Sequence, residues 1–227
     1  MWIAEQASGG DLDVPPTKVA AVHFALMVER RAAGEPLQYV LGSWGFRELD
    51  LWVDGRVLIP RPETEQVVEH ALRFARETLE SVPVLRVADL GTGSGAIALS
   101  LAAELPLGRV EVWATDVSED ALAVTRANLA GIGRAAASVR LVAGDWFEGL
   151  SGSFHLIVSN PPYVADDEVL PPEVSEWEPA SALYAGPSGL EVIERIVAGA
   201  PAWLAPHGAL VLEIGRASCR ERVSSVV

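Results

Sequence analysis

The sequence predicts an α/β fold in which a mostly parallel sheet is covered by helices on both faces. Three observations predict it. From residue 84 onward, short apolar runs alternate with helical segments, and the first run ends in a glycine-rich turn that leads into a helix. Half of the 227 residues are hydrophobic, which is enough to bury one sizeable core. Continuous apolar strands are typical of parallel sheets that are buried on both faces.

The chain before this alternating region is predicted to form one helix followed by a hairpin. Residues 17–33 carry apolar side chains at near-helical spacing, and Thr17 is placed to cap the helix. Between residues 36 and 62, aromatic and apolar residues come in short runs separated by glycines. The Asp54-Gly55 pair is a hairpin-turn signal, so we expect two or three short strands here.

A segment stiffened by prolines leads from the hairpin into a second helix, predicted at residues 62–79. Pro62 suits the first helical turn, and Glu63 and Glu65 complement the positive end of the helix. Arg61 lies between two prolines that fix its backbone. We therefore favour a role at a binding site over a solvated loop charge.

From residue 84 the pattern becomes a regular alternation of strands and helices. The strand candidates are residues 84–89, 110–115, 139–142, 154–159 and 209–214. The helix candidates are residues 96–104, 119–130 and 190–204.

A glycine-rich turn follows the first strand of this region, with the sequence Gly91-Thr92-Gly93-Ser94-Gly95. Glycines at alternate positions permit a tight turn and the close approach of a ligand to the backbone amides at a helix N-terminus. The same turn also satisfies a loose dinucleotide-binding pattern, so by itself it does not identify the ligand.

Acidic and aromatic residues follow the next two strands. Asp116 ends the second strand, where a carboxylate can accept both hydroxyl protons of an adenosine ribose. Asp145 and Trp146 follow the third strand, where an acid and a flat indole could hold and cover an adenine. Side chains of these kinds at three successive strand ends indicate a nucleoside-binding site. A nicotinamide or flavin dinucleotide is the alternative cofactor, but the later strands lack a His, a Tyr-Lys pair or an Arg to handle a hydride.

The fourth strand of this region stops at Ser159-Asn160-Pro161-Pro162-Tyr163. Proline has no amide hydrogen to continue a ladder, so Asn160 should sit at the carboxyl end of a buried strand. Ligands bind at that end of open parallel sheets, which places the Asn160 amide for chemistry. A strand followed by a simple turn is the alternative for this motif alone.

Composition excludes several classes of protein. Seventeen basic and 31 acidic residues give a net charge of −14, which disfavours a nucleic-acid partner. One cysteine excludes a disulfide framework, and the four histidines lack metal-ligand spacing. Neither a signal peptide nor an apolar run of the roughly 20 residues that span a bilayer is visible. We expect a cytoplasmic protein without a metal and without membrane contact.

The combination of motifs resembles one family closely. The glycine turn, Asp116 and the Asn-Pro-Pro-Tyr motif look like a Rossmann-like class I S-adenosylmethionine-dependent methyltransferase that acts on a planar nitrogen. The segments that narrow the resemblance are residues 36–42 (PLQYVLG), 58–65 (LIPRPETE), 145–147 (DWF) and 178–183 (EPxxAL). In this order, the set resembles the HemK-type N5-glutamine methyltransferases, which modify the Gly-Gly-Gln loop of peptide chain release factors.

The resemblance implies a substrate slot built from the Asn-Pro-Pro-Tyr motif. The Asn160 side-chain oxygen and the Pro161 carbonyl would accept the two hydrogens of the glutamine amide. Pro162 and Tyr163 would complete the slot that holds the flat amide, and Arg61 would lie over it.

The resemblance also implies where S-adenosyl-L-methionine binds. Gly91, Thr92, Gly93, Ser94 and Gly95 would line its methionine part. Asp116 would hold its ribose, Trp146 would lie by its adenine, and Asn160 would touch the cofactor side of the slot.

Two alternatives remain open. A DNA or RNA adenine N6-methyltransferase also uses a Pro-Pro-aromatic motif on a planar NH2, but it needs a basic channel and a pocket for a flipped base. The other alternative is a cofactor-binding fragment without activity.

The resemblance divides the chain into four parts. Residues 1–35 are expected to be the remnant of an N-terminal helical substrate-binding domain, residues 36–61 a hairpin linker, and residues 62–215 the methyltransferase domain. Residues 216–227 do not continue the family pattern and are expected to be a non-native tail. The last strands of the sheet are therefore expected to be missing.

Overall fold

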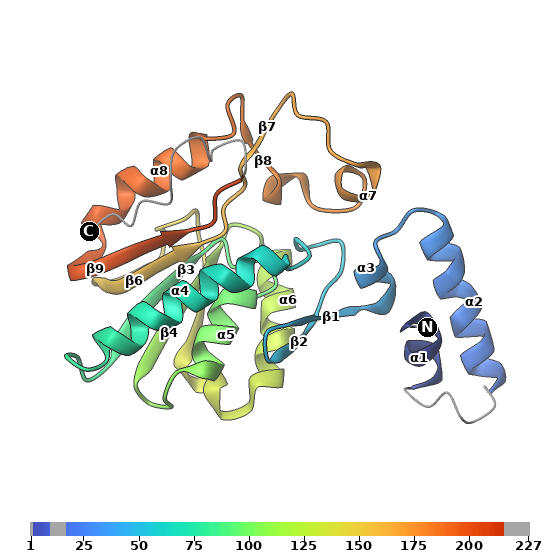
Figure 1. Ribbon diagram of the computed structural model, residues 1–227, viewed down its shortest axis with the longest axis horizontal. Coiled ribbons are helices and arrows are strands. Elements are labelled where there is room, and N and C mark those ends of the chain that lie inside the picture. Colours follow the sequence, from blue (N-terminus) through green and yellow to red (C-terminus); the bar gives the residue numbers. More distant parts are fainter. Residues whose placement is uncertain (1, 10–16, 216–227) are drawn as a thin grey trace.

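A five-stranded parallel sheet forms the centre of the molecule in the computed structural model, which describes residues 2–9 and 17–215 (Figure 1). The strand order is β5-β4-β3-β6-β9, and every neighbouring pair is parallel. The strands are β3 (Leu85–Leu90), β4 (Val110–Asp116), β5 (Val139–Ala143), β6 (Phe154–Ser159) and β9 (Leu204–Leu212). The predicted α/β fold with a parallel sheet is confirmed.

Helices cover both faces of this sheet. Helices α4 (Pro62–Thr78) and α5 (Ala96–Glu104) pack on one face, and α8 (Glu191–Gly199) packs on the other (Figure 1). Val87 belongs to the first hydrophobic cluster and Ala88 to the second, as expected when successive side chains of a strand point to opposite faces. The central strands are buried on both sides for this reason.

The order of the strands creates a switch point between β3 and β6. After β3 the chain moves outward through β4 and β5, and it then returns to the other side of β3 with β6. The connections on the two sides of β3 therefore diverge above its carboxyl end. In open α/β sheets, the crevice at such a point is where ligands bind.

The helical and hairpin parts precede the sheet. Besides the predicted helix, which is α2 (Lys18–Ala32), a further helix α1 (Trp2–Ser8) and a short helix α3 (Leu37–Leu41) are present. The side chain of Gln6 donates to the Leu41 carbonyl at 3.1 Å, which ties α1 to α3. Of the apolar residues of α2 only Met27 is buried.

The hairpin consists of β1 (Ser43–Phe46) and β2 (Leu49–Trp52), so the prediction of two or three strands is confirmed. Asp54-Gly55 does form a turn, in which the Val57 amide donates to the Asp54 carbonyl at 3.1 Å, but this turn follows β2 and does not join the two strands of the hairpin. The hairpin turn lies at Arg47 and Glu48, and Arg47 adopts a positive φ of 51°. Three acidic residues of other elements hold Arg47 there: Glu65 accepts from its backbone amide, and Glu69 and Glu104 accept from its guanidinium. These tertiary contacts support a hairpin turn that has no local turn signal.

The predicted helix at residues 190–204 ends early, because α8 stops at Gly199 and β9 begins at Leu204. Between them lies a short 3-10 turn, Ala200–Ala202, that contains Pro201, which cannot donate the amide hydrogen that a continuing helix needs.

The remaining elements join or follow these. They are α6 (Glu119–Leu129), the 3-10 helix Ala130–Ser138, β7 (Val164–Ala165), α7 (Pro172–Ser175), the 3-10 helix Ala180–Ala182 and β8 (Tyr184–Gly186). The predicted non-native tail at residues 216–227 lies outside the described residues.

Candidate active site

A pocket opens at the carboxyl ends of the strands, above the switch point between β3 and β6. It is bounded by the glycine turn after β3, by the ends of β4, β5 and β6, and by the segment between β2 and α4. The lining residues include Arg56, Pro60, Thr64, Gly91, Thr92, Gly93, Ser94, Asp116, Ser118, Asp145, Trp146, Asn160, Pro162 and Ser181.

Most of the predicted site residues come together in this pocket. Four residues of the glycine turn, together with Asp116, Trp146, Asn160 and Pro162, all line it. Gly95, Arg61, Pro161 and Tyr163 are described by the structure but are not among its lining residues. Contacts with a ligand remain predictions for the whole set.

The glycine turn favours glycine at Gly91 and Gly95, because both have a positive φ and close neighbours. Gly91 has a φ of 71°, and a Cβ there would lie 3.3 Å from the Trp146 ring. Gly95 has a φ of 88°, and a Cβ there would lie 2.8 Å from Cγ2 of Thr125. Any larger residue would therefore strain the backbone and push away the side chains that shape the pocket.

A buried carboxylate supports the turn from below. Oδ2 of Asp89 accepts from the Thr92 hydroxyl at 2.7 Å and from the Ala98 amide at 3.1 Å. Its Oδ1 is buried and has no hydrogen-bond partner among residues 2–9 and 17–215. Burial raises the pKa of Asp89 to about 7, against the lowering effect of its two donors.

Asp116 links the end of β4 to the glycine turn. Its Oδ2 accepts from the Gly93 amide and its Oδ1 from the Ser118 amide, both at 2.9 Å. Burial raises its pKa, while these backbone donors act in the opposite direction. Because each carboxylate oxygen can accept more than one hydrogen bond, Asp116 can still receive ligand hydroxyls.

Trp146 forms one side of the pocket next to the turn. It has a positive φ of 55°, unusual for a tryptophan, and its carbonyl accepts from the Thr115 hydroxyl at 3.0 Å. This bond fixes the backbone so that the indole lies against Gly91. The neighbouring Asp145 pairs with Arg195 of α8 at 2.7 Å.

The Asn160 amide lies at the end of β6 and is held by a chain of hydrogen bonds. Its Nδ2 donates to the Thr64 hydroxyl at 3.1 Å, and that hydroxyl donates to Oε2 of Glu213 at 2.6 Å. The amide of Glu213 donates to the Ser159 carbonyl at 3.0 Å, next to Asn160 in the chain. Tyr163 reaches the other carboxylate oxygen, Oε1, only at 3.5 Å.

Arg61 pairs with a buried acid, not with the pocket. Its Nη2 donates to Oε1 of Glu178, whose side chain is 1% exposed, and the Ile59 amide donates to the other oxygen at 3.0 Å. This pair joins the segment before α4 to the segment after α7. The proposed substrate contact of Arg61 stays a prediction.

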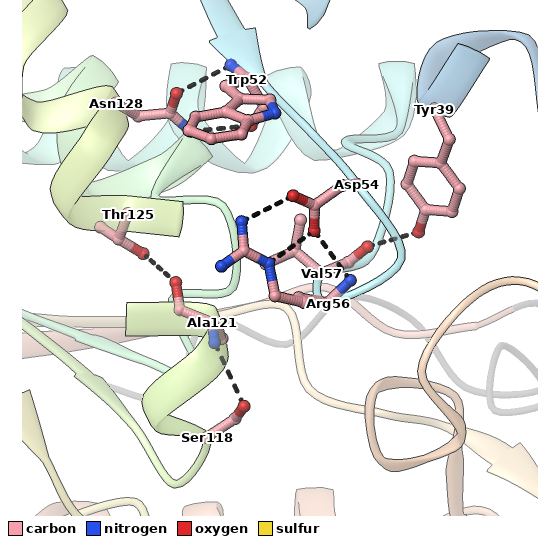
Figure 2. A network of polar contacts seen from close by, with 9 residues as sticks. All are labelled: Tyr39, Trp52, Asp54, Arg56, Val57, Ser118, Ala121, Thr125 and Asn128. Carbon is pink, nitrogen blue, oxygen red and sulfur yellow. Dashed lines mark hydrogen bonds and ion pairs between the residues drawn. The ribbon is translucent and has the colours of Figure 1, made fainter. Parts of the chain in front are cut away.

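Helix α6 holds the glycine turn through two residues that sequence reasoning missed. The Thr125 hydroxyl donates to the Gly93 carbonyl at 2.7 Å. Nδ2 of Asn128 donates to the Ser94 carbonyl at 2.9 Å. The same Nδ2 donates to the Trp52 carbonyl at 3.0 Å, while Oδ1 of Asn128 accepts from the Trp52 amide at 2.7 Å (Figure 2). Neither Thr125 nor Asn128 belongs to a sequence motif that would indicate that it holds the glycine turn.

The segment after β2 forms a further wall that sequence reasoning missed. Arg56 lines the pocket beside Ala121 of α6 and pairs with Asp54 at 2.6 Å (Figure 2). The Tyr39 hydroxyl donates to the Val57 carbonyl at 2.5 Å and anchors this segment to α3.

The pocket carries polar groups at both ends, and the side chain at its Asn160 end is a neutral amide. Backbone amides and a carboxylate surround the glycine turn, and an amide oxygen with two prolines follows β6. Among the described residues, no group of three or more His, Cys, Asp or Glu could hold a metal ion. No helix in the same residues is long and apolar enough to cross a membrane. Such a pocket can bind a nucleoside and orient a planar amide beside it.

Comparisons with known proteins relate this chain to methyltransferases. Residues 65–175 match the Methyltransferase small domain family. The release factor glutamine methyltransferase of Xylella fastidiosa strain 9a5c is 45% identical over 208 residues, which cover 89% of this chain and 72% of that protein. The protein of the same name from Deinococcus radiodurans is 48% identical over 82% of this chain and 64% of its own length.

A solved structure shows the same fold. The S-adenosylmethionine-dependent methyltransferase from Agrobacterium tumefaciens superimposes with a TM-score of 0.50, at 18% identity, over 76% of this chain and 52% of that one.

Proposed function

The chain belongs to the release factor glutamine methyltransferase family, and we propose that its pocket carries out the reaction of that family. The pocket would bind S-adenosyl-L-methionine at the glycine turn. A methyl group would pass to the side-chain amide nitrogen of the glutamine in the Gly-Gly-Gln motif of a peptide chain release factor.

The observation that carries this proposal is the meeting of two motifs in one pocket. The glycine turn with Asp116 and the motif that begins at Asn160 are separated in sequence but flank the same switch point. One side of the pocket suits a nucleoside cofactor and the other suits a planar amide.

The cofactor side would work through backbone groups and one carboxylate. Gly91, Gly93 and their neighbours in the turn present the backbone to the methionine part, and Asp116 accepts the ribose hydroxyls. Trp146 covers the adenine. The bound cofactor supplies an electrophilic methyl group on its positively charged sulfur.

The substrate side would orient a weak nucleophile. The lone pair of a glutamine amide nitrogen is delocalised into its carbonyl, so the nitrogen must be aimed at the methyl group. The Asn160 side-chain oxygen and the Pro161 carbonyl accept its two hydrogens and stabilise the positive charge that develops on nitrogen. Alignment of the two reactants can supply about 7–11 kcal/mol. As the bond between nitrogen and the methyl carbon forms, the carbon–sulfur bond would break and leave S-adenosylhomocysteine, and the nitrogen would then release one proton to solvent, so the transfer itself needs no general base.

The remaining motif residues would shape the slot. Pro162 lines the pocket and can flank the flat amide. Tyr163 lies against Gly215, with its hydroxyl toward Glu213, and would support the slot from behind. Arg61 would act near the entrance. Because the proposed substrate acts on the ribosome, we place the enzyme in the cytoplasm, and its net charge of −14 argues against direct nucleic-acid binding.

The experiment compares wild type and Asn160→Ala by mass spectrometry of a release factor incubated with S-adenosylmethionine. We expect methylation of the Gly-Gly-Gln glutamine by wild type and an at least roughly hundredfold slower rate in the variant. Calorimetric binding of S-adenosylhomocysteine to both proteins separates lost transfer from lost cofactor binding. A release factor with alanine in place of the glutamine is the substrate control.

Two results would overturn the proposal. Methyl transfer to DNA but not to a release factor would favour an adenine methyltransferase. An unchanged rate in Asn160→Ala would remove Asn160 from the reaction.

A further inference from the structure

The hydrogen bonds that link Asn160, Thr64 and Glu213 all run in one direction, because each donor points toward Glu213. The Asn160 NH2 group faces Thr64, so Oδ1 is the end of the amide that remains for a ligand in the pocket. Within residues 2–9 and 17–215, Oδ1 has no hydrogen-bond partner. The two ends of an amide are nearly the same in shape but opposite in hydrogen bonding, so packing alone does not choose between them.

The carboxylate of Glu213 determines which end of the Asn160 amide faces Thr64. An ionised carboxylate can only accept hydrogen bonds, so the single hydroxyl proton of Thr64 must point toward it. The lone pairs of the same hydroxyl then face Asn160 and accept only from its NH2 group. A protonated Glu213 could instead donate to Thr64, which would free the hydroxyl proton to bond Oδ1 of Asn160. The amide would then turn its NH2 group into the pocket.

Both supporting residues are placed for this role. Thr64 is 3% exposed in the first turn of α4, and Glu213 is 8% exposed just after β9. Thr64 and Glu213 therefore approach the end of β6 from two different elements, and both side chains are largely removed from water.

On these grounds we infer that Thr64 and Glu213 are positioning residues that keep the oxygen of Asn160 turned toward the substrate amide. This inference rests on the proposed function, because only an NH2 donor in the substrate needs an acceptor there. With the amide reversed, two NH2 groups would face each other and the substrate would lose its orientation.

The charges around Glu213 set the pH at which the hydrogen bonds from Asn160 through Thr64 to Glu213 would reverse their direction. Glu63 and Arg61 face it from the start of α4, and Tyr163 faces it from the segment after β6. Burial raises the pKa of Glu213, and the nearby Glu63 adds to this, whereas the Thr64 hydroxyl and Arg61 lower it. The ionised form orients Asn160 correctly, so the correct orientation is present at high pH and lost as the pH falls through this pKa.

The first test reads the Asn160 amide without any substrate. The chain contains two asparagines, Asn128 and Asn160, so labelling with 15N-asparagine gives two side-chain NH2 signals, and Asn160→Ala assigns them. In Thr64→Val we expect the Asn160 signal to exchange with solvent at least about tenfold faster, because it has lost its buried acceptor. Asn128 is the internal reference and should not change. Equal exchange of Asn160 in wild type and Thr64→Val would overturn the inference.

The second test reads the reaction. We expect Thr64→Val to lower kcat about tenfold, with KM for the release factor within about twofold, and Thr64→Ser to stay within about threefold of wild type. Glu213→Gln should lower kcat and abolish the fall of kcat at acidic pH. Thr78→Val is the matched control, since Thr78 lies at the other end of α4 and its side-chain hydroxyl donates to the Phe74 carbonyl in its own helix.

The outcomes separate the positioning role of Thr64 and Glu213 from the proposed methyltransferase function. An active wild type with unchanged kcat in Thr64→Val, or an acidic limb that persists in Glu213→Gln, overturns the positioning role alone. A wild type that methylates no release factor overturns the proposed function, while the exchange test still decides whether the NH2 group of Asn160 donates to Thr64. Circular dichroism and S-adenosylhomocysteine binding identify variants that fail to fold.

Discussion

Replacing Asn128 by alanine should loosen the glycine turn and the hairpin together. The Asn128 side chain makes three hydrogen bonds, to the Trp52 amide at 2.7 Å, the Trp52 carbonyl at 3.0 Å and the Ser94 carbonyl at 2.9 Å. At about 1 kcal/mol for each bond, the loss is about 3 kcal/mol of unfolding free energy. For a chain of this size that corresponds to a fall in Tm of roughly 6–12 °C.

Urea unfolding of wild type, Asn128→Ala and Asn128→Asp measures this loss. The aspartate keeps the acceptor for the Trp52 amide but sets a carboxylate against two carbonyl oxygens, so we expect it to be less stable than the alanine variant. Arg126→Ala, an exposed change on the same helix, is the control and should stay within about 0.5 kcal/mol of wild type. S-adenosylhomocysteine should bind Asn128→Ala more weakly, because Ser94 lines the pocket. A loss below about 1 kcal/mol in Asn128→Ala would refute the reasoning.

Two further predictions concern buried carboxylates. Burial raises the pKa of Asp89 from its ordinary value of 3.8 to about 7, so the folded chain keeps a proton that the unfolded chain releases, and stability falls as pH rises through this window. Asp89→Asn should remove that part of the slope in urea unfolding at about pH 5 and about pH 8, and identical slopes would contradict it. Arg61→Met leaves the buried Glu178 carboxylate without its cation and should cost about 2 kcal/mol, less than for a fully buried pair because Arg61 is partly exposed. Adding Glu178→Gln should recover part of the loss in the same assay, and no recovery would argue against an unpaired charge as the cause.

Local patterns predicted the sheet and its chemistry because they are set by neighbouring residues. An apolar run that ends in Asn160 and two prolines must stop a strand there, whatever surrounds it. The glycines after β3 allow the positive φ that this strand-to-helix turn needs, and Gly91 has a φ of 71°. The strand ends and most of the pocket could therefore be found before the fold was known.

Local patterns failed where distant residues compete with them. Asp54-Gly55 forms a turn after β2, but the hairpin itself turns at Arg47, which Glu65, Glu69 and Glu104 hold from two helices. The helix predicted before β9 is too long, because Pro201 ends it.

The fold class follows from the sequence pattern, which also places a glycine turn, a carboxylate and an amide at the ends of strands. The groups that support them are brought together by the folded chain alone. Thr64 meets Asn160 across 96 residues of sequence and Glu213 across 149, and Arg61 meets Glu178 across 117. Such contacts depend on the order of strands in the sheet, and periodicity along the chain carries no record of that order. The orientation of the Asn160 amide, on which the proposed chemistry depends, is for this reason a property of the folded molecule.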